Sequence, residues 1–384
     1  MDKIDELLTR GVEQIIPAKK KLEDVLRSGK KLRLYQGFDP TSPELHIGHL
    51  VGLRKLRQWQ DLGHEVIFLL GDFTATVGDP TGKDKTRPMI SEENVAKNAQ
   101  TYKDQASKIL RFDGKNPVKI KRNSEWLGKL SFLELAQLAS KLTVQQVIER
   151  DMFQNRLKSG GDVAISEFFY PLMQGYDSVA MDVDLEVGGN DQLFNMMTGR
   201  DLMHKIKQKN KFVMTTPLLV DSTGKKIGKS EGNAIGLTLP AKEQFGMIMQ
   251  LDDTVILKCF ECLTTIPMEE VSKIGERLKA GENPMVLKKQ LAHQIVSELH
   301  SKAEADKAQE EFEKTFQKKE IGEVEEIKAS AVEDLIKAGI ISSKSEWKRL
   351  VEQGAIEREG EKVENEEILP GTYRIGKKKF VKIA

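Results

Sequence analysis

Two histidines at helical spacing follow a short turn near the start of the chain. His46 and His49 enclose Ile47 and Gly48, and the apolar residues that follow repeat as on one face of a helix. Residues i and i+3 of a helix share a face, so both imidazoles point the same way. A glycine lets a flat purine or ribose lie against the backbone, and the start of a helix offers unpaired N–H groups and a positive potential. The motif predicts a nucleotide site.

The same pair of histidines is also typical of a solvated helix surface or of half a metal site. No cysteine and no further histidine clusters with His46 and His49 in the sequence. Because a protein-held metal needs three or four such ligands, we expect no metal site at this position.

A lysine- and glycine-rich loop lies in the second half of the chain. Lys226 and Lys229 flank Gly228, and Ser230 follows. Two ammonium groups on a mobile loop can close over a triphosphate and neutralise the charge that moves onto pyrophosphate. Loops of this composition are more often solvated turns, so the motif indicates phosphate chemistry only in combination with the histidine pair.

The segments that would position these motifs alternate between strand and helix. Residues 31–36 alternate as a strand does, residues 46–62 carry one apolar helical face, and residues 65–70 form a second strand. This is a βαβ unit, whose ligands bind beyond the carboxyl ends of its strands, so the turn at 37–41 is expected at the active site. The other elements of this Rossmann-like α/β domain with a parallel sheet are predicted at residues 183–187, 191–206 and 213–220.

The chain is predicted to divide into three domains. With 384 residues it is too long for one ordinary compact core. Residues 1–236 are expected to form the catalytic domain, which opens on a helical pair at residues 7–26. Its helices at about 130–160 are more apolar than their own packing needs and are a candidate dimer interface. We expect an all-helical domain at 237–316, a charged linker at 317–326 and a small α+β module at 327–384.

Composition and charge are those of an ordinary globular protein. Lys and Arg total 60 against 59 Asp and Glu, so a nucleic-acid site needs its positive charge gathered on one face. The longest strongly apolar stretch, residues 66–70, is far shorter than the roughly 20 residues of a membrane span. The chain starts with acidic residues, unlike a secretory signal, so we expect a cytoplasmic protein without a membrane role. Cys259 and Cys262 are expected to be free thiols, with a redox pair or half a zinc site as the alternative.

A polar stripe is predicted on a helix in the middle of the chain. Tyr170, Gln174 and Asp177 stand at positions i, i+4 and i+7 among apolar neighbours. Polar groups on a buried face need hydrogen-bond partners. Neighbouring helices are one possible partner; the other is a zwitterionic phenol, which Tyr, Gln and Asp are suited to recognise. Pro171 predicts either a kink or the first turns of this helix.

Together these motifs resemble those of the bacterial tyrosyl-tRNA synthetases. The runs at 46–49 and 226–230 resemble the HIGH and KMSKS signatures of class I aminoacyl-tRNA synthetases, and YQGFDPT, GDPTGK and GGNDQ at 35–41, 78–83 and 188–192 are similar to segments of the tyrosyl family. The resemblance extends essentially end to end. It implies a ligase that uses ATP to convert L-tyrosine to tyrosyl-adenylate, with release of pyrophosphate, and then transfers tyrosine to the 3′-terminal ribose of tRNA(Tyr).

The resemblance assigns the tyrosine site residue by residue. Tyr35 and Asp177 would hydrogen-bond the phenolic hydroxyl of the substrate, and Gln192 would lie near its carboxylate. The residues that would hold the ammonium group are Asp79, Tyr170 and Gln174.

The resemblance also assigns the ATP site. Thr41 and His46 would bind the γ-phosphate, and His49 would lie on the ribose side. The residues expected around the nucleotide are Gly37, Asp39, Gly48, Gly189 and Asp191. The cations expected on the pyrophosphate are Lys83, Arg87, Lys226 and Lys229, with Ser230 beside them. Mg²⁺ is expected to be held mainly by the phosphates, because the sequence contains no dedicated carboxylate cage.

The partners implied are tRNA(Tyr) and a second copy of the chain. The helical domain would lie on the anticodon side, and the C-terminal module resembles a small RNA-binding module that occurs in a ribosomal protein. Lys344, Lys348 and Arg349 would face phosphates there. Without the resemblance, these side chains would be interpreted as solvated surface.

Two other functions remain open at this stage. A tryptophanyl-tRNA synthetase would share the fold, but Tyr35 with Asp177 suits a substrate hydroxyl. An RNA-binding regulator could keep the fold without catalysis, but both signatures and the amino-acid pocket are intact in the sequence.

Overall fold

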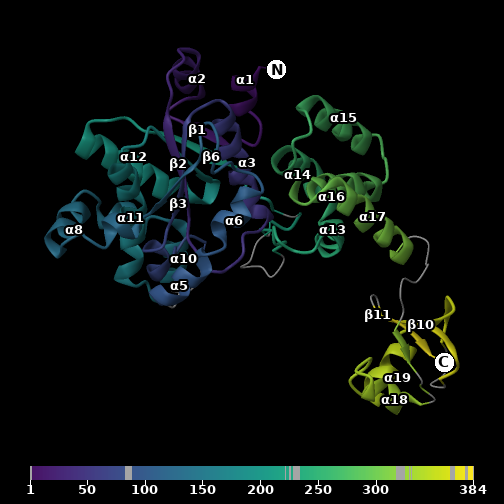
Figure 1. The fold of residues 1–384 in the computed structure, drawn as a ribbon. Helices are drawn as coiled ribbons and strands as arrows, with labels where there is room; N and C mark the ends of the chain where they lie inside the picture. Colours follow the sequence, from purple (N-terminus) through teal and green to yellow (C-terminus); the bar gives the residue numbers. More distant parts are fainter. Residues whose placement is uncertain are drawn as a thin grey trace. The chain divides into compact units, whose positions relative to one another are not determined.

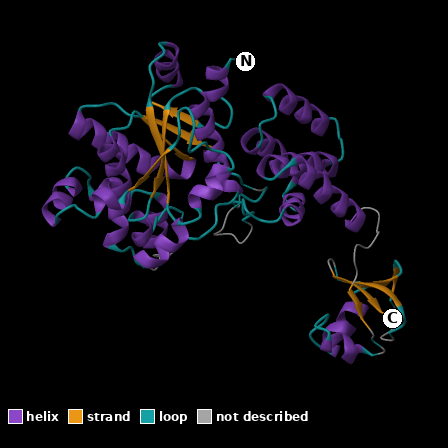
Figure 2. Cartoon of the chain, viewed as in Figure 1, coloured by secondary structure: helices purple, strands orange, loops and turns teal. Residues whose placement is uncertain are grey.

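The computed structural model has two compact units, Met1–Asp306 and Lys307–Ala384. Figures 1 and 2 colour the chain by sequence and by secondary structure. The residues that the structure describes are 2–82, 89–220, 222–224, 226–227, 234–316, 325–327, 329, 331–363, 368–376 and 379–383.

A six-stranded sheet forms the centre of the first unit, in the order β1-β6-β5-β2-β3-β4. The chain runs from β2 outward to β3 and β4, and then returns to β5 and β6 on the other side. The switch point therefore lies between β2 and β5, which is where open α/β sheets bind ligands. The predicted α/β fold with a parallel core is confirmed. The parallel strands are β2 (Arg33–Phe38), β3 (Glu65–Leu70), β4 (Lys119–Arg122), β5 (Leu185–Gly189) and β6 (Phe212–Thr216).

Helices cover both faces of this sheet. α3 (Ile47–Asp61) connects β2 to β3, and α12 (Leu193–Lys207) connects β5 to β6. α11 (Ile165–Met181) precedes β5 and packs along α12. Figure 1 shows α11 and α12 on one side of the sheet and α3 on the other. This arrangement leaves the carboxyl ends of the central strands open to a ligand.

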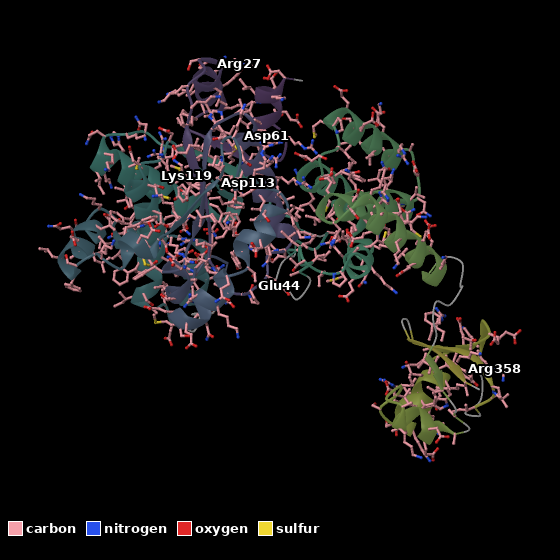
Figure 3. All side chains as sticks on the ribbon, in the orientation of Figure 1. Arg27, Glu44, Asp61, Asp113, Lys119 and Arg358 are labelled. Atoms are coloured by element: carbon pink, nitrogen blue, oxygen red, sulfur yellow. The ribbon has the colours of Figure 1, made fainter. Side chains whose placement is uncertain are left out.

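The N-terminal segment differs from the predicted helical pair. Two helices are present, α1 (Lys3–Leu7) and α2 (Lys19–Arg27), but β1 (Gln14–Ile16) lies between them and pairs antiparallel with β6. The two isoleucines that end β1 are β-branched, and the residue before a proline disfavours helical backbone, so this stretch is extended. Arg27, labelled in Figure 3, links the two helices through ion pairs with Asp2 and Asp5.

One further segment also differs from the sequence predictions. β4 was not predicted because it reads Lys-Ile-Lys-Arg; it is an edge strand, where charged side chains are tolerated. The helices expected at about 130–160 are α8 (Phe132–Ala139), α9 (Val144–Ile148) and α10 (Asp151–Lys158). Ser131 and Thr143 cap α8 and α9 through capping boxes, so each of these helices has its own N-terminus.

The remaining helices of the first unit are short connectors or belong to its helical part. The connectors are α4 (Thr74–Val77), α5 (Glu92–Ala99), α6 (Tyr102–Ser107), α7 (Ser124–Leu127) and a 3₁₀ turn at Asn190–Gln192. The helical part contains α13 (Ala241–Met249), a 3₁₀ turn at Asp253–Val255, α14 (Ile256–Leu263), α15 (Met268–Lys279) and α16 (Pro284–Leu299), and α17 (Lys302–Phe316) follows.

The second unit carries a five-stranded sheet in the order β7-β11-β10-β8-β9. Trp347 and Tyr373 are buried at its centre. The predicted linker residues 317–324 lie outside the described residues. The elements are β7 (Glu325–Ile327), α18 (Val332–Lys337), α19 (Lys344–Glu352), β8 (Ile356–Arg358), β9 (Glu361–Lys362), β10 (Gly371–Ile375) and β11 (Lys379–Ile383). In neither unit is any described helix both long and apolar enough to span a membrane.

Candidate active site

A cavity of about 740 Å³ opens at the carboxyl ends of β2 and β5. It lies at the switch point of the sheet, and it brings together both signature motifs and the polar stripe. The predicted site residues that line it are Tyr35, Gly37, Asp39, Thr41, His46, Gly48, His49, Asp79, Tyr170, Gln174, Asp177, Gly189, Asp191, Gln192 and Lys226. The predicted residues Lys83, Arg87, Lys229 and Ser230 lie outside the described part of the chain.

The two histidines cap the start of α3 with their own rings. The Nδ1 atom of His46 accepts a hydrogen bond from the Gly48 N–H at 3.1 Å, and the Nδ1 atom of His49 accepts one from the His46 N–H, also at 3.1 Å. A neutral imidazole with an accepting Nδ1 carries its proton on Nε2. Burial, together with the nearby His46, lowers the pKa of His49 well below its ordinary value. His49 is therefore a neutral donor through Nε2, suited to a ribose or phosphate oxygen.

Gly48 lets the two signatures approach each other. A Cβ atom at this position would lie 2.9 Å from the His46 ring and 3.4 Å from the carbonyl oxygen of Ile227. The start of α3 is also joined to the chain beyond the lysine loop, because the Ile47 N–H donates to the Ile235 carbonyl at 2.9 Å. The start of α3 and the loop that carries Lys226 therefore lie next to each other in one site.

Lys226 contacts the acidic wall of the cavity. Its ammonium group forms an ion pair with Asp191, which follows β5 in the Gly-Gly-Asn-Asp-Gln run. Asp191 is the carboxylate expected near the ribose. Lys226 and the carboxylate of Asp191 are thus adjacent.

The polar stripe on α11 faces the other end of the cavity. The carboxylate of Asp177 accepts hydrogen bonds from Trp126 Nε1 at 2.8 Å and Asn123 Nδ2 at 3.3 Å, and burial raises its pKa well above the ordinary range. Tyr170 donates its hydroxyl to Asp39 at 2.8 Å. Pro171 lies inside the helix, and Tyr170 and Asp177 on either side of it still reach the same cavity.

A second carboxylate and an amide lie between the two ends of the cavity. Gln192 donates from Nε2 to Asp79 at 2.7 Å, and the Thr81 N–H donates to the other oxygen of Asp79 at 2.9 Å. Asn195 donates to the Gln192 amide oxygen at 3.0 Å and fixes the orientation of that amide. A cationic group near Asp79 would therefore meet a carboxylate that Thr81 and Gln192 already hold in position.

Comparisons with known proteins agree with this geometry. The family described as tRNA synthetases class I (W and Y) matches residues 27–317. Tyrosine–tRNA ligase 2 of Vibrio cholerae is 45% identical over 98% of this chain and 97% of its own length. The chain belongs to the tyrosyl-tRNA synthetase family.

Other members of the family are also similar in sequence and in structure. Tyrosine–tRNA ligase of Thermotoga maritima is 44% identical over 99% of this chain and 96% of its own. The C-terminally truncated mitochondrial tyrosyl-tRNA synthetase of Aspergillus nidulans superposes with a TM-score of 0.67 at 25% identity, over 82% of this chain and 94% of that one. The Archaeoglobus fulgidus tyrosyl-tRNA synthetase, solved with L-tyrosine, has the same fold with a TM-score of 0.63 at 24% identity, over 80% of this chain and all of that one.

Several residues that support the site were not predicted from the sequence. Asn123 and Trp126, which bind Asp177, follow the unpredicted strand β4. Thr74 donates to Asp39 at 2.8 Å. Glu186, on β5, lines the cavity in the middle of an apolar strand. A charged residue inside an otherwise apolar strand is the one signal that could have indicated a role for Glu186.

No group of three His, Cys, Asp or Glu side chains that could hold a metal occurs among the described residues. Cys259 and Cys262 are buried free thiols, and burial raises the pKa of both above the ordinary value. A raised pKa favours the protonated thiol, whereas the thiolate is the form that binds metals and attacks disulfides.

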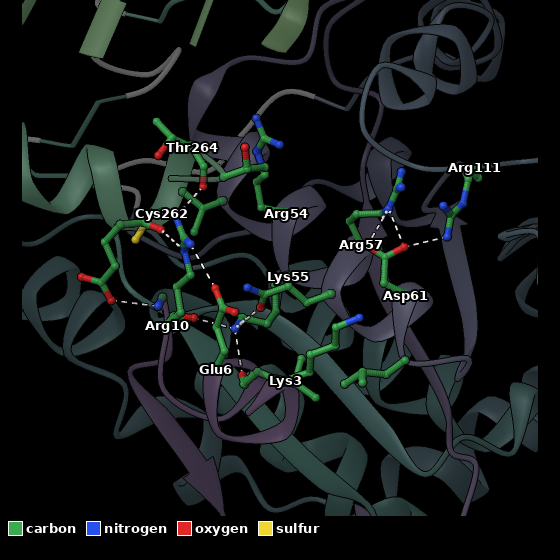
Figure 4. Close-up of a pocket in the computed structure, with 17 residues that line it drawn as sticks. Lys3, Glu6, Arg10, Arg54, Lys55, Arg57, Asp61, Arg111, Cys262 and Thr264 are labelled. Atoms are coloured by element: carbon green, nitrogen blue, oxygen red, sulfur yellow. Dashed lines mark hydrogen bonds and ion pairs between the residues drawn. The ribbon is translucent and has the colours of Figure 1, made fainter. Parts of the chain in front are cut away.

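A second cavity of about 510 Å³ lies where α1 and α3 meet α14 (Figure 4). Its wall carries many cations, but hydrogen bonds hold the central ones. Lys55 donates to the Leu7 carbonyl at 2.9 Å and to Gln58 Oε1 at 2.7 Å, and burial lowers its pKa to about 7. Arg54 donates to the Leu263 carbonyl at 3.2 Å. The contacts of this cavity join the sheet to the helical part of the unit.

Replacing Arg10 by alanine is expected to destabilise this junction. Its guanidinium donates to the carbonyls of Glu261 at 2.8 Å and Thr264 at 2.6 Å, beside the end of α14, and pairs with Glu6 at 3.0 Å. Losing these bonds should lower the free energy of unfolding by about 2–4 kcal/mol, measured by urea unfolding. Lys3→Ala, which removes another cation of the same cavity wall, is the control. An equal loss in both variants would contradict the role of Arg10 in binding the carbonyls at the end of α14.

Proposed function

We propose that this chain is a tyrosine–tRNA ligase that performs both steps of aminoacylation. In the first, the carboxylate of L-tyrosine attacks the α-phosphorus of ATP and pyrophosphate leaves. In the second, a 3′-terminal ribose hydroxyl of tRNA(Tyr) attacks the adenylate, and AMP leaves. The observation that carries the proposal is that Asp177 and Tyr35 lie in the same cavity as the histidine helix, which suits a phenol at one end and a nucleotide at the other.

The tyrosine end is proposed to read the substrate by its polar groups. The Asp177 carboxylate and the Tyr35 hydroxyl would bind the phenolic hydroxyl, and Asp79 would hold the ammonium group with Tyr170 and Gln174. Gln192 would face the substrate carboxylate. Phenylalanine would leave the buried hydrogen-bonding groups of such a site unpaired, and the rejection already established for this enzyme family is about 10⁵-fold.

The nucleotide end is proposed to act by position and charge. Neutral His49 would donate to the ribose side, and His46 and Thr41 would donate to the γ-phosphate. Gly37, Gly189 and Asp191 would surround the ribose, while Asp39 stays bound to Tyr170 and Thr74. Lys226 would move from Asp191 to the pyrophosphate, with Lys83, Arg87 and Lys229 as further cations and Ser230 beside them. Stabilising the charge on the leaving pyrophosphate is the main catalytic effect.

Mg²⁺ is proposed to enter the site with ATP. The described residues do not gather a carboxylate cage for it, so the phosphates would supply most of its ligands. The roles proposed for the protein itself, which are to bind the substrates and to stabilise charge on pyrophosphate, belong to side chains at the tyrosine and nucleotide ends.

ATP–pyrophosphate exchange with each of the twenty amino acids tests the function. We expect exchange with tyrosine and less than about 10⁻⁴ of that efficiency with phenylalanine. Exchange that depends on tryptophan would instead support a tryptophanyl enzyme. The absence of exchange with every amino acid would support an RNA-binding regulator.

The chain is proposed to act on tRNA in the cytoplasm through its helical part and its second unit. The exposed residues Lys344, Lys348 and Arg349 lie on α19 and would contact phosphates. The proposal rests on the local positive charge of these three residues, because the net charge of the whole chain is only +1.

Deleting residues 317–384 is expected to separate the two steps. The deletion keeps α17 and removes the second sheet. Pyrophosphate exchange should stay within about threefold of the full chain, while tRNA charging should fall by about tenfold or more, because phosphate contacts supply much of the affinity for nucleic acids. Lys344→Glu/Lys348→Glu/Arg349→Glu in the full chain is the matched variant and should show the same split. Equal losses in exchange and charging would remove the case for an RNA-binding module.

The chain is also proposed to form a homodimer through the helices at 130–160 and the start of α11. Phe132, Val144 and Ile165 are 88%, 60% and 75% exposed. Exposed apolar side chains at this density mark association surfaces. Phe132→Asp/Ile165→Asp should shift the mass in light scattering from two chains to one, whereas Met89→Asp, at an exposed methionine elsewhere, should not. A single-chain mass for the unmodified protein would contradict the proposal.

A further inference from the structure

A buried ion pair lies beneath the amino-acid end of the cavity. Lys211, next to the start of β6, binds Glu186 of β5, and their exposed fractions are 0% and 2%. The free-energy cost of removing two charges from water offsets most of their attraction, so a buried ion pair contributes little to stability by itself. Its position next to the site suggests a functional reason for it.

The pair is connected to two residues of the tyrosine site. One oxygen of Glu186 accepts a hydrogen bond from Gln174 Nε2 at 3.0 Å, and the other accepts from Lys211 and from Ser178 Oγ at 3.3 Å. Lys211 also donates to Ser178 Oγ at 2.8 Å. The Tyr35 hydroxyl lies 2.9 Å from the same Ser178 oxygen. Gln174 and Tyr35 line the cavity, so the buried pair contacts the site through both.

The charges fix the direction of these hydrogen bonds. A carboxylate only accepts and an ammonium group only donates. Gln174 must therefore turn its NH₂ group to Glu186, which leaves its amide oxygen for a substrate ammonium. Ser178 Oγ accepts a hydrogen bond from Lys211 and donates one to Glu186, so the Tyr35 hydroxyl donates, either to Ser178 or to the Gln174 carbonyl oxygen at 3.4 Å. Ser178 therefore holds the Tyr35 hydroxyl in place at the phenol end of the cavity.

The packing of two helices makes room for this arrangement. A Cβ atom on Gly199 of α12 would lie 2.6 Å from the Lys211 ammonium nitrogen and 3.0 Å from Ser178 Oγ. It would also lie 3.3 Å from the Cα atom of Gly175 on α11. The glycine pair therefore provides the space that the lysine head group occupies.

We propose that Lys211 and Glu186 are positioning residues for the tyrosine substrate. Through Glu186 they hold the Gln174 amide oxygen toward the ammonium group, and through Ser178 they hold the Tyr35 hydroxyl at the phenol end of the cavity. The proposal rests on the tyrosine-activating function and adds two residues that would act on the substrate through Gln174 and Tyr35.

Binding of L-tyrosine to Lys211→Met and Glu186→Gln, measured by calorimetry alongside pyrophosphate exchange, tests it. We expect the Kd for tyrosine to rise by about tenfold or more in each full-length variant, and the KM for ATP to stay within about twofold. Discrimination against phenylalanine should fall. If Lys211→Met does not fold, the isosteric Glu186→Gln carries the test.

The double variant Lys211→Met/Glu186→Gln separates positioning from stability. A neutral pair restores the stability lost when one charge is left alone. An amide at 186 can donate as well as accept, so it no longer fixes Gln174. We expect recovery of the unfolding midpoint without recovery of tyrosine affinity. Recovery of both would reduce the pair to a structural element and overturn the proposal.

The buried ion pair Arg156–Glu167 provides the matched control. The two side chains are 3% and 5% exposed, and neither lines the cavity. Arg156→Met should lower the unfolding midpoint and leave the tyrosine Kd unchanged. A tyrosine Kd within about twofold of wild type in both Lys211→Met and Glu186→Gln, or an equal rise in Arg156→Met, would overturn the proposal. An unmodified chain without tyrosine-dependent exchange would overturn the proposed function as well, whereas an active chain with unchanged variants would overturn only this inference.

Discussion

Replacing Asp177 by alanine is expected to abolish tyrosine-dependent pyrophosphate exchange while the chain stays folded. Asp177 is the buried carboxylate at the phenol end of the cavity, held by Asn123 and Trp126. Without it, the substrate hydroxyl would lose a hydrogen bond to a buried carboxyl group inside a desolvated site. We expect kcat/KM for tyrosine to fall by about 10³-fold or more.

The stability of the same variant provides an independent check. Burial raises the pKa of Asp177 well above its ordinary value of 3.8. An acid with a raised folded pKa destabilises the protein as pH rises above its unfolded pKa, because the unfolded chain releases the proton more readily. The alanine variant should therefore lose less stability than wild type as pH rises above 3.8, in thermal unfolding followed by circular dichroism. Asp201→Ala, at an exposed position on α12, should match wild type in both activity and stability; near-normal exchange in Asp177→Ala would refute the assignment.

Replacing Lys226 by methionine is expected to slow adenylate formation with little effect on tyrosine binding. Its ammonium group pairs with Asp191 in the structure and is proposed to transfer to the pyrophosphate during the reaction. A cation that interacts with charge only as that charge develops in the transition state affects kcat. Removing one such group typically lowers kcat by about 10²–10³-fold. Single-turnover formation of adenylate, followed with radiolabelled ATP, measures this rate directly.

The control for this experiment is Lys207→Met, at an exposed lysine that ends α12. It removes the same charge without reaching the cavity, so the rate should not change. If Lys226→Met raises the KM for ATP and leaves kcat unchanged, the lysine would bind ground state and transition state equally, and its assignment to the leaving group would be wrong.

The parts of the fold that follow local patterns could be predicted from the sequence. The strand at 65–70 is a short continuous apolar run and the helix after His46 has a clear helical period, and the observed elements β3 and α3 agree with them closely. Tyr170 and Asp177 could be assigned to one face because helical spacing is regular. Strand β1 was missed because Ile15 and Ile16 also fit the helical spacing of their neighbours, and their pairing with β6 is a contact that spacing along the chain does not show.

The supporting residues of the site could not be predicted, because they meet Asp177 and Gln174 only in the folded chain. Asn123 and Trp126 lie more than fifty positions from Asp177, at 54 and 51 residues. Lys211 stands in a stretch of charged and polar residues that is typical of a solvated turn, yet its side chain is fully buried. A single sequence does not distinguish such a lysine from an exposed neighbour.

The backbone bonds between the start of α3 and the chain after the lysine loop have a consequence for how the enzyme tolerates change. Ile47 bonds Ile235, and the Leu237 N–H donates to the Leu45 carbonyl at 2.9 Å. On the other side, the Ile227 N–H donates to the Leu219 carbonyl at 2.8 Å. The loop is thereby tethered at both ends to fixed parts of the scaffold. Added or deleted residues between Ile227 and Ile235 would change the length of chain that carries Lys229 and would leave Lys226 where it is.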